Sequence, residues 1–267
     1  MNIGICGLGF VGNAIYQFMN DSSLLHHHNV FVYDKYKAIN NLDALLYCDI
    51  IYICLPTLFD ADLGSYNMNE INNTIYLLSE EKYNGIILLK STVLPTYCED
   101  INMQYPLLKI IHNPEFLSAK TAIQDFKEQT HIILGYTIYS KPCIPFIESF
   151  YKSLFPQSII SINNSTVSAL TKLACNSFYA TKVQYFTELY LLCERINVDF
   201  NDVKVLMLGN EWINPMHTSI PGPDGQVSFG GACLPKDISA LNQYMADLGI
   251  DNAVIDSTIK ERNKMRE

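Results

Sequence analysis

Short apolar runs alternate with stretches of helical period over residues 1–162, and this alternation limits the possible folds more than any other feature. The runs are rich in β-branched residues and lie at residues 2–6, 29–34, 49–56, 85–91, 109–114, 131–135 and 158–162. Near-continuous runs of this kind are typical of strands that helices bury on both faces. The pattern therefore predicts the α/β class, with a Rossmann-type, doubly wound parallel sheet.

The remainder of the chain is predicted to be helical. A single helical register runs from about Ser165 to Arg195, with Ser165 as the expected N-cap. So long a helix is expected to connect two units or to form a subunit interface. Further helices are expected near 201–208, from Pro235 onwards and at the end of the chain, whereas the segment 214–231 is too rich in Pro and Gly for regular structure.

The composition excludes several classes of partner and location. The formal net charge is −9, whereas a surface that binds nucleic acid or an anionic membrane needs clustered Lys and Arg. The sequence has no apolar run of the roughly 18 residues that a membrane span requires, and its start lacks the basic region of a signal peptide. The eight cysteines form no C-x-x-C pair, which favours reduced thiols over disulfides. We therefore expect a cytoplasmic protein.

The segment GLGFVG follows the first expected strand and opens a helix. Gly7, Gly9 and Gly12 match the pattern G-x-G-x-x-G, and Asp34 ends the next expected strand. Such glycines let backbone N–H groups approach a pyrophosphate, and an acidic residue at this distance meets ribose hydroxyls. The charge of Asp34 would repel the 2′-phosphate of NADP, so NAD is the expected cofactor, although Lys35 follows directly. A tight turn without a ligand would use the same glycines.

The segment FGGACLPKD, residues 229–237, places Cys233 at the expected start of a helix. The positive end of the helix and the neighbouring Lys236 would favour a thiolate, and Asp237 would lie on the same helical face. A cysteine is most often an inert, small apolar side chain, which is our interpretation of the other cysteines. Cys233 is instead a candidate nucleophile.

No metal site is predicted. The nearest second zinc ligand to Cys233 is His217, which leaves the set of ligands that zinc needs incomplete. The run from His26 to His28 falls in an expected surface turn, where a solvated loop is the better interpretation.

Lys172 and Asn176 are four residues apart in the long helix and share one of its faces. A surface lysine is the ordinary interpretation. Their neighbours in LTKLACNSF are apolar, however, so both polar groups would be partly buried. This setting favours a functional role.

Together these motifs resemble a known family. The segments GLGFVG, STVLP (91–95), NPEFL (113–117), TKLACNSFYATKV (171–183) and FGGACLPKD occur in the order found in UDP-glucose/GDP-mannose dehydrogenases. The resemblance covers nearly the whole chain. It implies an NAD-binding Rossmann-like domain over 1–162 and a helical central and dimerisation domain over 163–267, which carries the catalytic cysteine loop.

The resemblance implies an NAD-dependent, four-electron oxidation of a nucleotide sugar from its C6 alcohol to a carboxylate. UDP-glucose is the first expected substrate, and GDP-mannose is the alternative. Cys233 would capture the aldehyde as a thiohemiacetal and then carry a thioester. Lys172 would stabilise the oxyanions, and Glu115 would act as acid and base in thioester hydrolysis.

The remaining roles follow from the same resemblance. Asn176 and Asp237 would orient water or accept its proton, and Thr92 would support the catalytic water. The residues expected to bind the cofactor are Gly7, Gly9, Phe10, Val11, Gly12, Asp34, Lys35, Pro56, Thr57 and Thr92. Those expected to bind the substrate are Glu115, Phe116, Leu117, Lys172, Asn176, Phe229, Gly230 and Gly231.

The chain departs from the family pattern at three places. Ser118 and Ala119 stand where members carry Arg and a second Glu, and that Glu is expected near the nicotinamide. Trp212 replaces an arginine before the Pro/Gly segment. The sequence also ends where typical members continue into a further nucleotide-sugar-binding domain, so substrate binding would rest on the Pro/Gly segment and a partner subunit. A short family member is thus expected.

A homodimer through residues 165–195 is expected because this helix carries large apolar side chains, among them Phe178, Tyr185, Phe186 and Leu189.

Two other functions stay open. One is a non-catalytic NAD-binding homologue with an interaction or regulatory role, against which the joint presence of the candidate catalytic residues argues. The other is a one-step hydroxyacid dehydrogenase, which would need no cysteine at position 233.

Overall fold

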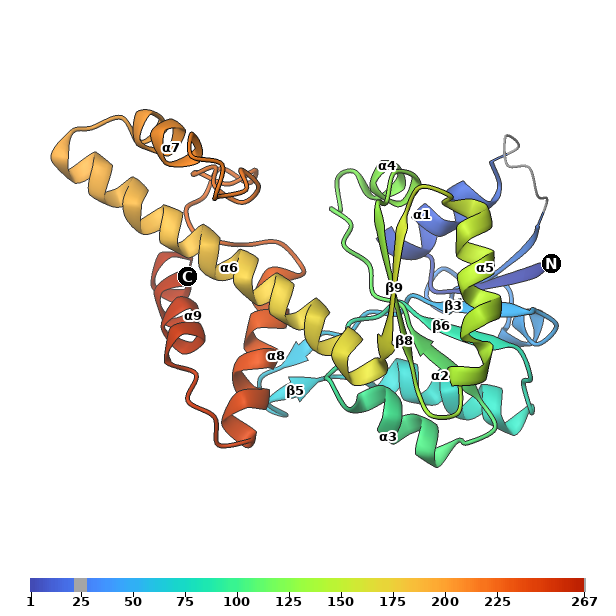
Figure 1. Ribbon diagram of the computed structural model, residues 1–267. Coiled ribbons are helices and arrows are strands. Elements are labelled where there is room, and N and C mark those ends of the chain that lie inside the picture. The colour runs from blue at the N-terminus through green and yellow to red at the C-terminus, as the bar shows by residue number, and fades with distance from the viewer. Residues whose placement is uncertain (22–27, 267) are drawn as a thin grey trace. The chain divides into compact units, whose positions relative to one another are not determined.

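The computed structural model describes residues 1–21 and 28–266 (Figure 1). Its contacts divide the chain into two compact units. Unit 1 contains residues 1–58 and 66–172, and unit 2 contains residues 59–65 and 173–267. The predicted boundary, between residues 162 and 163, lies at the start of the long helix, whereas the contacts divide the chain inside it.

The sheet of unit 1 is built from the predicted apolar runs. In the described residues it has seven strands in the order β2-β1-β3-β6-β7-β8-β9. Their bounds are β1 Asn2–Cys6, β2 Asn29–Tyr33, β3 Ile50–Ile53, β6 Ile86–Leu89, β7 Lys109–His112, β8 His131–Tyr136 and β9 Ile159–Asn164. Strands β2, β1, β3, β6 and β7 pair in parallel. The predicted α/β class and Rossmann-type arrangement are confirmed.

One pairing differs from the predicted all-parallel sheet, because β8 runs antiparallel to β7 while β9 is parallel to β8. The connection from β7 to β8 contains α4, Ala122–Lys127, whose 6 residues rise only about 9 Å. Because β8 is antiparallel to β7, it starts at the edge of the sheet where β7 ends, without a βαβ crossover, and the sheet is mixed.

Helices cover both faces of this sheet (Figure 1). Ile15 of α1, Phe126 of α4 and Tyr151 of α5 are buried against one face. Ile75 of α2 and Ile101 of α3 are buried against the other. The bounds are α1 Phe10–Met19, α2 Asn69–Glu80, α3 Tyr97–Gln104 and α5 Ile144–Leu154, with 3-10 turns at η1 Leu42–Leu45 and η2 Lys141–Cys143. The apolar strands are thus covered from both sides, as their sequence predicts.

Unit 2 is mainly helical. Its helices are residues 173–196 of α6, then α7 Phe200–Leu208, α8 Leu234–Asp247 and α9 Ala253–Met265. The short strand β4, Phe59–Asp60, pairs with β5, Ser65–Tyr66, and contacts α8. Phe186, Phe229 and Ile238 lie in its apolar core. The predicted loop over 214–231 forms turns and bends. Helix α8 begins at Leu234, with proline in its first turn as predicted.

Helix α6, Ser165–Ile196, follows the predicted register, but its cap differs. The Asn164 side chain accepts a hydrogen bond from Val167 N, which is the N-cap interaction. The Ser165 hydroxyl instead donates to Glu99 Oε1 at 3.2 Å. Asn164 therefore caps the helix, because Ser165 is already its first residue.

The side chains expected in a dimer interface on α6 differ in exposure. Phe178 and Tyr185 are 63% and 54% exposed, whereas Phe186 is buried in the core of unit 2. The apolar surface of this helix is therefore carried by Phe178 and Tyr185 rather than by Phe186. No helix in the described part of the chain is both long enough and apolar enough to cross a membrane.

Candidate active site

The glycine turn between β1 and α1 has the geometry that G-x-G-x-x-G predicts. Gly7 has φ +90°, in the left-handed region that favours glycine. A Cβ on Gly12 would lie 1.9 Å from the Gly7 oxygen, so this position has room for glycine alone. A Cβ on Gly9 would meet no heavy atom within 4 Å. The turn therefore presents the N-terminus of α1 to open space, as anion binding requires.

Asp34 follows β2 directly and holds the glycine turn. Its Oδ2 accepts from Leu8 N at 2.8 Å, and its Oδ1 accepts from Tyr36 N at 3.0 Å and Lys37 N at 2.9 Å. Burial acts to raise the pKa of this carboxyl, but the three backbone N–H groups outweigh burial and lower the pKa. Asp34 is therefore a fixed negative charge beside the turn, which agrees with the predicted exclusion of NADP.

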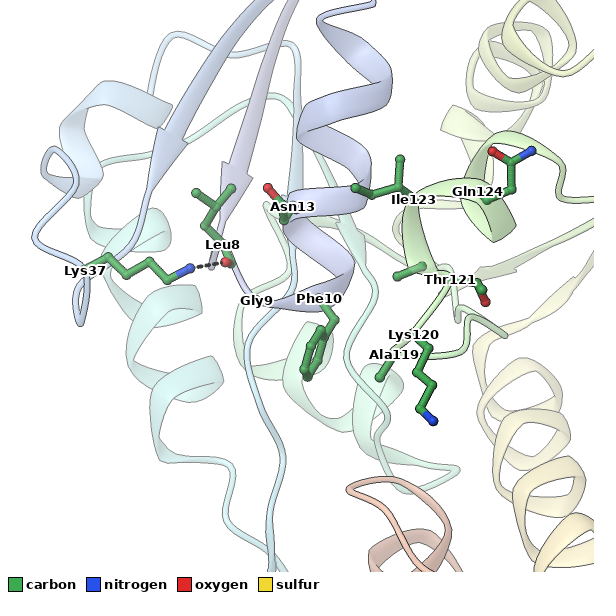
Figure 2. Close-up of a pocket in the computed structure, with 11 residues that line it drawn as sticks. Leu8, Gly9, Phe10, Asn13, Lys37, Ala119, Lys120, Thr121, Ile123 and Gln124 are labelled. Atoms are coloured by element: carbon green, nitrogen blue, oxygen red, sulfur yellow. Dashed lines mark hydrogen bonds between the residues drawn. The ribbon is translucent and has the colours of Figure 1, made fainter. Parts of the chain in front are cut away.

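A pocket of about 820 Å³ opens beside this turn (Figure 2). Gly9 and Phe10 form part of its wall, and the segment 119–124, which leads into α4, lies across from them (Figure 2). The Lys37 ammonium also lines the pocket and donates to Leu8 O at 2.6 Å. The full lining is Leu8, Gly9, Phe10, Asn13, Lys37, Ala119, Lys120, Thr121, Ala122, Ile123 and Gln124.

These residues fit a dinucleotide. The space that a Cβ on Gly9 would enter is open. No side chain caps α1, and the first turn of this helix carries no acidic residue. The N–H groups at the start of α1 can therefore bind a pyrophosphate. Sequence reasoning marked only position 119 of the segment 119–124, as the place of a family carboxylate expected near the nicotinamide. It missed residues 120–124, which the fold brings beside the glycine turn.

The other predicted cofactor residues lie in varied settings. The Thr57 hydroxyl is buried and donates to Thr92 O at 2.8 Å, and Pro56 next to it is exposed. The Lys35 ammonium instead pairs with Glu70 Oε1 at 3.2 Å, in an exposed ion pair. Val11 is half-buried in the first turn of α1. Contact of these residues with NAD stays a prediction.

Glu115 and Lys172, predicted to act together, meet in unit 1. The Lys172 ammonium donates to the main-chain oxygen of Glu115 at 2.5 Å and lies 3.3 Å from its Oε1. Glu115 Oε2 accepts from Leu117 N at 2.5 Å, and the Lys172 ammonium lies 4.9 Å from the Phe116 ring centroid. The NPEFL segment thus wraps one buried ammonium with a carboxylate, a carbonyl and an aromatic face.

A second group of predicted residues meets in unit 2. The Asn176 amide donates to Asp237 Oδ2 at 2.5 Å, and both side chains are buried. The Lys236 ammonium lies 2.5 Å from Asp237 Oδ1, so the charge predicted to act on the thiol also balances this carboxylate. Cys233 is exposed at the N-cap position of α8, and its carbonyl accepts from Asp237 N at 3.1 Å. The thiol therefore stands at the positive end of a helix, as predicted.

The loop before Cys233 is held by a residue that sequence reasoning missed. Arg266 donates from Nε to Val227 O and from a terminal nitrogen to Ser228 O, each at 2.7 Å. A Cβ on Gly230 would lie 2.1 Å from Arg266, and Gly231 has φ +78°. The path of the loop therefore favours glycine at position 231, and a side chain at position 230 would displace the Arg266 guanidinium. No sequence signal links an arginine near the end of α9 to this loop.

In the described residues, no group of three or more His, Cys, Asp or Glu side chains is arranged to hold a metal ion. His26 and His27 of the histidine run lie outside the described residues.

Two family models account for most of the chain. Residues 34–155 match the NAD binding domain, and residues 166–264 the central domain, of the UDP-glucose/GDP-mannose dehydrogenase family. The chain belongs to this family. NAD is accordingly the cofactor of its N-terminal domain, as the glycine turn and Asp34 predict.

Known relatives agree with this assignment. The UDP-glucose 6-dehydrogenase of Rickettsia typhi is 30% identical over 230 residues, which are 82% of this chain and 50% of that protein. The GDP-mannose 6-dehydrogenase of Pseudomonas putida is 27% identical over 234 residues, which are 82% of this chain and 51% of that protein. The chain thus spans about half the length of the curated relatives that it matches.

Solved structures share the fold. A UDP-glucose dehydrogenase from Pyrobaculum islandicum superposes with a TM-score of 0.80 at 19% identity, over 97% of this chain and 67% of that one. A 3-hydroxyisobutyrate dehydrogenase from Mycobacterium tuberculosis superposes with a TM-score of 0.72 at 16% identity, over 98% of this chain and 92% of that one. At these identities the likeness concerns the fold alone.

The departures from the family pattern have definite places in this UDP-glucose/GDP-mannose dehydrogenase family member. Ala119 lines the pocket beside the glycine turn, where the family pattern would put a carboxylate. Ser118 N donates to Asp125 Oδ2 at 2.8 Å, which connects the segment before α4 to that helix. The Trp212 side chain is 90% exposed.

Proposed function

We propose that this protein oxidises the C6 alcohol of a nucleotide sugar to a carboxylate with NAD, with UDP-glucose as the first candidate substrate and GDP-mannose as the second. The observation that carries the proposal is the setting of Cys233, which is exposed at the N-cap of α8 while the buried Asp237 lies in the first turn of that helix. A simple alcohol dehydrogenase has no use for a thiol in this position.

The cofactor would be held by the glycine turn, with the pyrophosphate at the N-terminus of α1 and a ribose near Asp34. When bound, NAD accepts the hydride of each oxidation step. The chain's own part is to bind it and to exclude NADP. The charge of Asp34, fixed by three backbone N–H groups, serves the second purpose.

The thiol of Cys233 would carry the carbon between the two oxidations. Its sulfur adds to the C6 aldehyde to give a thiohemiacetal, and loss of a hydride from that carbon gives a thioester. Water then attacks the thioester carbon, the C–S bond breaks, and the carboxylate and the thiol are released. Each sugar consumes one water molecule and reduces two NAD.

Charged and polar groups would serve this chemistry. The Lys172 ammonium would stabilise the oxyanions. Because it is buried, where little water screens it, its attraction for an oxyanion is stronger than in solvent. Glu115 would exchange protons with water in thioester hydrolysis, assisted by Asn176 and Asp237. Thr92 would support that water.

We also infer a homodimer formed through α6. This inference is supported by the exposed Phe178 and Tyr185, which a partner subunit would cover.

The test counts NADH per sugar and identifies products by mass spectrometry. The wild-type protein is expected to give two NADH and one uronate per nucleotide sugar. The Cys233→Ser variant should bind NAD normally and accumulate an adduct on the protein, because an ester hydrolyses more slowly than a thioester. Cys175→Ser, in α6, is the matched control and should behave as wild type.

Three outcomes would reject the proposal. Two NADH per sugar from Cys233→Ser would show that the thiol is not the nucleophile. One NADH per substrate, with a carbonyl product, would identify a one-step dehydrogenase instead. Absence of turnover with every UDP- and GDP-sugar, despite NAD binding, would favour a non-catalytic role.

A further inference from the structure

Lys90 is a buried ammonium that directly follows β6 and carries no role in the proposed mechanism. Lys90 is only 4% exposed. The ammonium donates to Asn113 Oδ1 at 3.0 Å and to Pro114 O at 3.5 Å. A buried charge of this kind stabilises the folded protein less than an apolar side chain of the same size would, unless its partners compensate fully for its desolvation. Its presence therefore calls for a reason other than stability.

The partner of Lys90 is itself held firmly. Asn113 Oδ1 also accepts from the Tyr151 hydroxyl at 2.5 Å, and Asn113 Nδ2 donates to Ile133 O at 2.8 Å. Asn113 thus connects the ends of β6 and β7 with β8 and α5 at one buried point. Lys90 adds a contact with the next residue, Pro114. The ammonium consequently fixes the first two residues of the NPEFL segment.

The third residue of that segment is Glu115, which binds Lys172. Glu115 is placed by the chain that leaves Pro114 and by its own contact with Leu117 N. The Lys172 ammonium depends on two oxygens of Glu115, one of them the main-chain oxygen. A shift of the Pro114 peptide would therefore move both groups. Lys90 stands at the start of this chain of contacts.

The charges around Lys90 agree with this arrangement. Burial lowers the pKa of its ammonium to about 8, while the Cys54 thiol and the Glu115 carboxylate oppose the lowering and the Lys172 ammonium adds to it. The His112 imidazole also feels the Lys90 charge. These groups come from the ends of β3 and β7, from the NPEFL segment and from α6. Lys90 therefore interacts electrostatically with both Lys172 and Glu115.

We propose that Lys90 is a positioning residue for Glu115 and Lys172, and that its positive charge keeps this pair in its working arrangement. Its catalytic consequence rests on the proposed function. The positioning itself does not, since it concerns contacts within unit 1.

The kinetic test compares three variants over about pH 7 to 9.5. Lys90→Met removes the charge, Lys90→Arg keeps a charge that does not titrate, and Lys109→Met is the control. Lys109 also donates to an asparagine, through Asn84 O at 2.6 Å and Oδ1 at 2.9 Å, but it is less buried and lies at the far end of β7. Thermal unfolding establishes that each variant is folded.

Lys90→Met is expected to lower kcat about tenfold or more at pH 7, with the KM for NAD within about twofold of wild type. The ratio of wild-type to Lys90→Met kcat should fall toward one as the pH rises through about 8, because the wild-type ammonium then loses its proton. Lys90→Arg should retain most of the neutral-pH activity and lack this step. Lys109→Met should match wild type. Equal profiles for Lys90→Met and Lys109→Met would overturn the proposal.

A second measurement does not depend on turnover. In protein labelled with ¹³C at the lysine ε carbons, the Lys172 resonance should shift as Lys90 titrates, and this shift should vanish in Lys90→Arg. An unchanged titration-linked shift in Lys90→Arg would overturn the positioning role even in an active enzyme. If the wild-type protein is inactive, that failure concerns the proposed function, and the resonance of Lys172 decides the proposal about Lys90.

Discussion

The Asn176 amide and the Asp237 carboxylate form a buried hydrogen bond of 2.5 Å between α6 and α8, and the carboxylate also pairs with Lys236. The bond places a negative charge within the first turn of the helix that Cys233 caps. A carboxylate in this position can accept a proton from water, which an amide cannot do.

Asp237→Asn should therefore lower kcat by about two orders of magnitude, because it removes the proton acceptor while keeping the shape. Stopped-flow and steady-state assays with UDP-glucose would measure the effect. Asp247→Asn is the control, since Asp247 lies in α8 and accepts from Gln243 Nε2 at 2.7 Å but is exposed. An Asp237→Asn enzyme as fast as this control would exclude a proton-transfer role.

The glycine turn makes a prediction that separates folding from cofactor binding. Gly12→Ala should reduce the free energy of unfolding by about 2 kcal/mol or more, because the added Cβ meets the Gly7 carbonyl at 1.9 Å. Gly9→Ala should leave stability nearly unchanged and weaken NAD binding about tenfold or more, because its Cβ enters open space beside the pocket. Urea unfolding and calorimetry measure the two effects, and a Gly9→Ala protein that binds NAD normally would contradict the pocket assignment.

Cofactor choice should depend on Asp34. Calorimetry is expected to show tighter binding of NAD than of NADP, and Asp34→Asn should reduce that preference, because the repulsion of a 2′-phosphate disappears. Asp43→Asn, an exposed carboxylate of η1, is the control. A preference that persists in Asp34→Asn would assign discrimination to another residue.

The buried His112 should make the protein sensitive to acid. Burial lowers the pKa of its imidazole from 6.5 to about 3. The unfolded chain therefore binds the additional proton first, and stability falls as the pH drops below about 6.5. Down to about pH 4.5 the expected loss is roughly 2 to 3 kcal/mol.

Urea unfolding between about pH 7 and 4.5 measures this slope. His112→Gln should show a shallower loss than wild type, because glutamine does not titrate. His131→Gln is the control, since His131 also bonds a serine hydroxyl, that of Ser161, but is exposed. Equal slopes for the two variants would show that His112 is not the origin of the acid sensitivity.

The homodimer inferred above should depend on the exposed aromatic residues of α6. Light scattering at micromolar concentration is expected to report a dimer for wild type and a monomer for a Phe178→Asp, Tyr185→Asp double variant. The exposed Tyr76 of α2 offers a control, as Tyr76→Asp should remain dimeric. A monomeric wild-type protein would remove the inference.

Several features of the fold follow from local sequence alone. The strands lie where β-branched runs occur, because such residues fit a pleated and buried surface whatever their distant partners are. The turn at Gly7 and Gly12 is determined by short-range steric contact, and the start of α8 by proline in its first turn. These interactions act between residues that are close in the chain, so they can be recognised from the sequence.

The arrangement of the candidate site was decided by the tertiary structure. Glu115 and Lys172 are separated by 57 residues, and Asn176 and Asp237 by 61, so their contacts depend on which helix faces pack together. The antiparallel direction of β8 is a property of the assembled sheet, and the partners of Lys90 follow from the neighbouring ends of β6 and β7. Sequence indicated which side chains are candidates for the chemistry, because residue type is local. The sequence could not predict which donor would bond to which acceptor, because a hydrogen bond depends on atomic positions that only the packing of the elements determines.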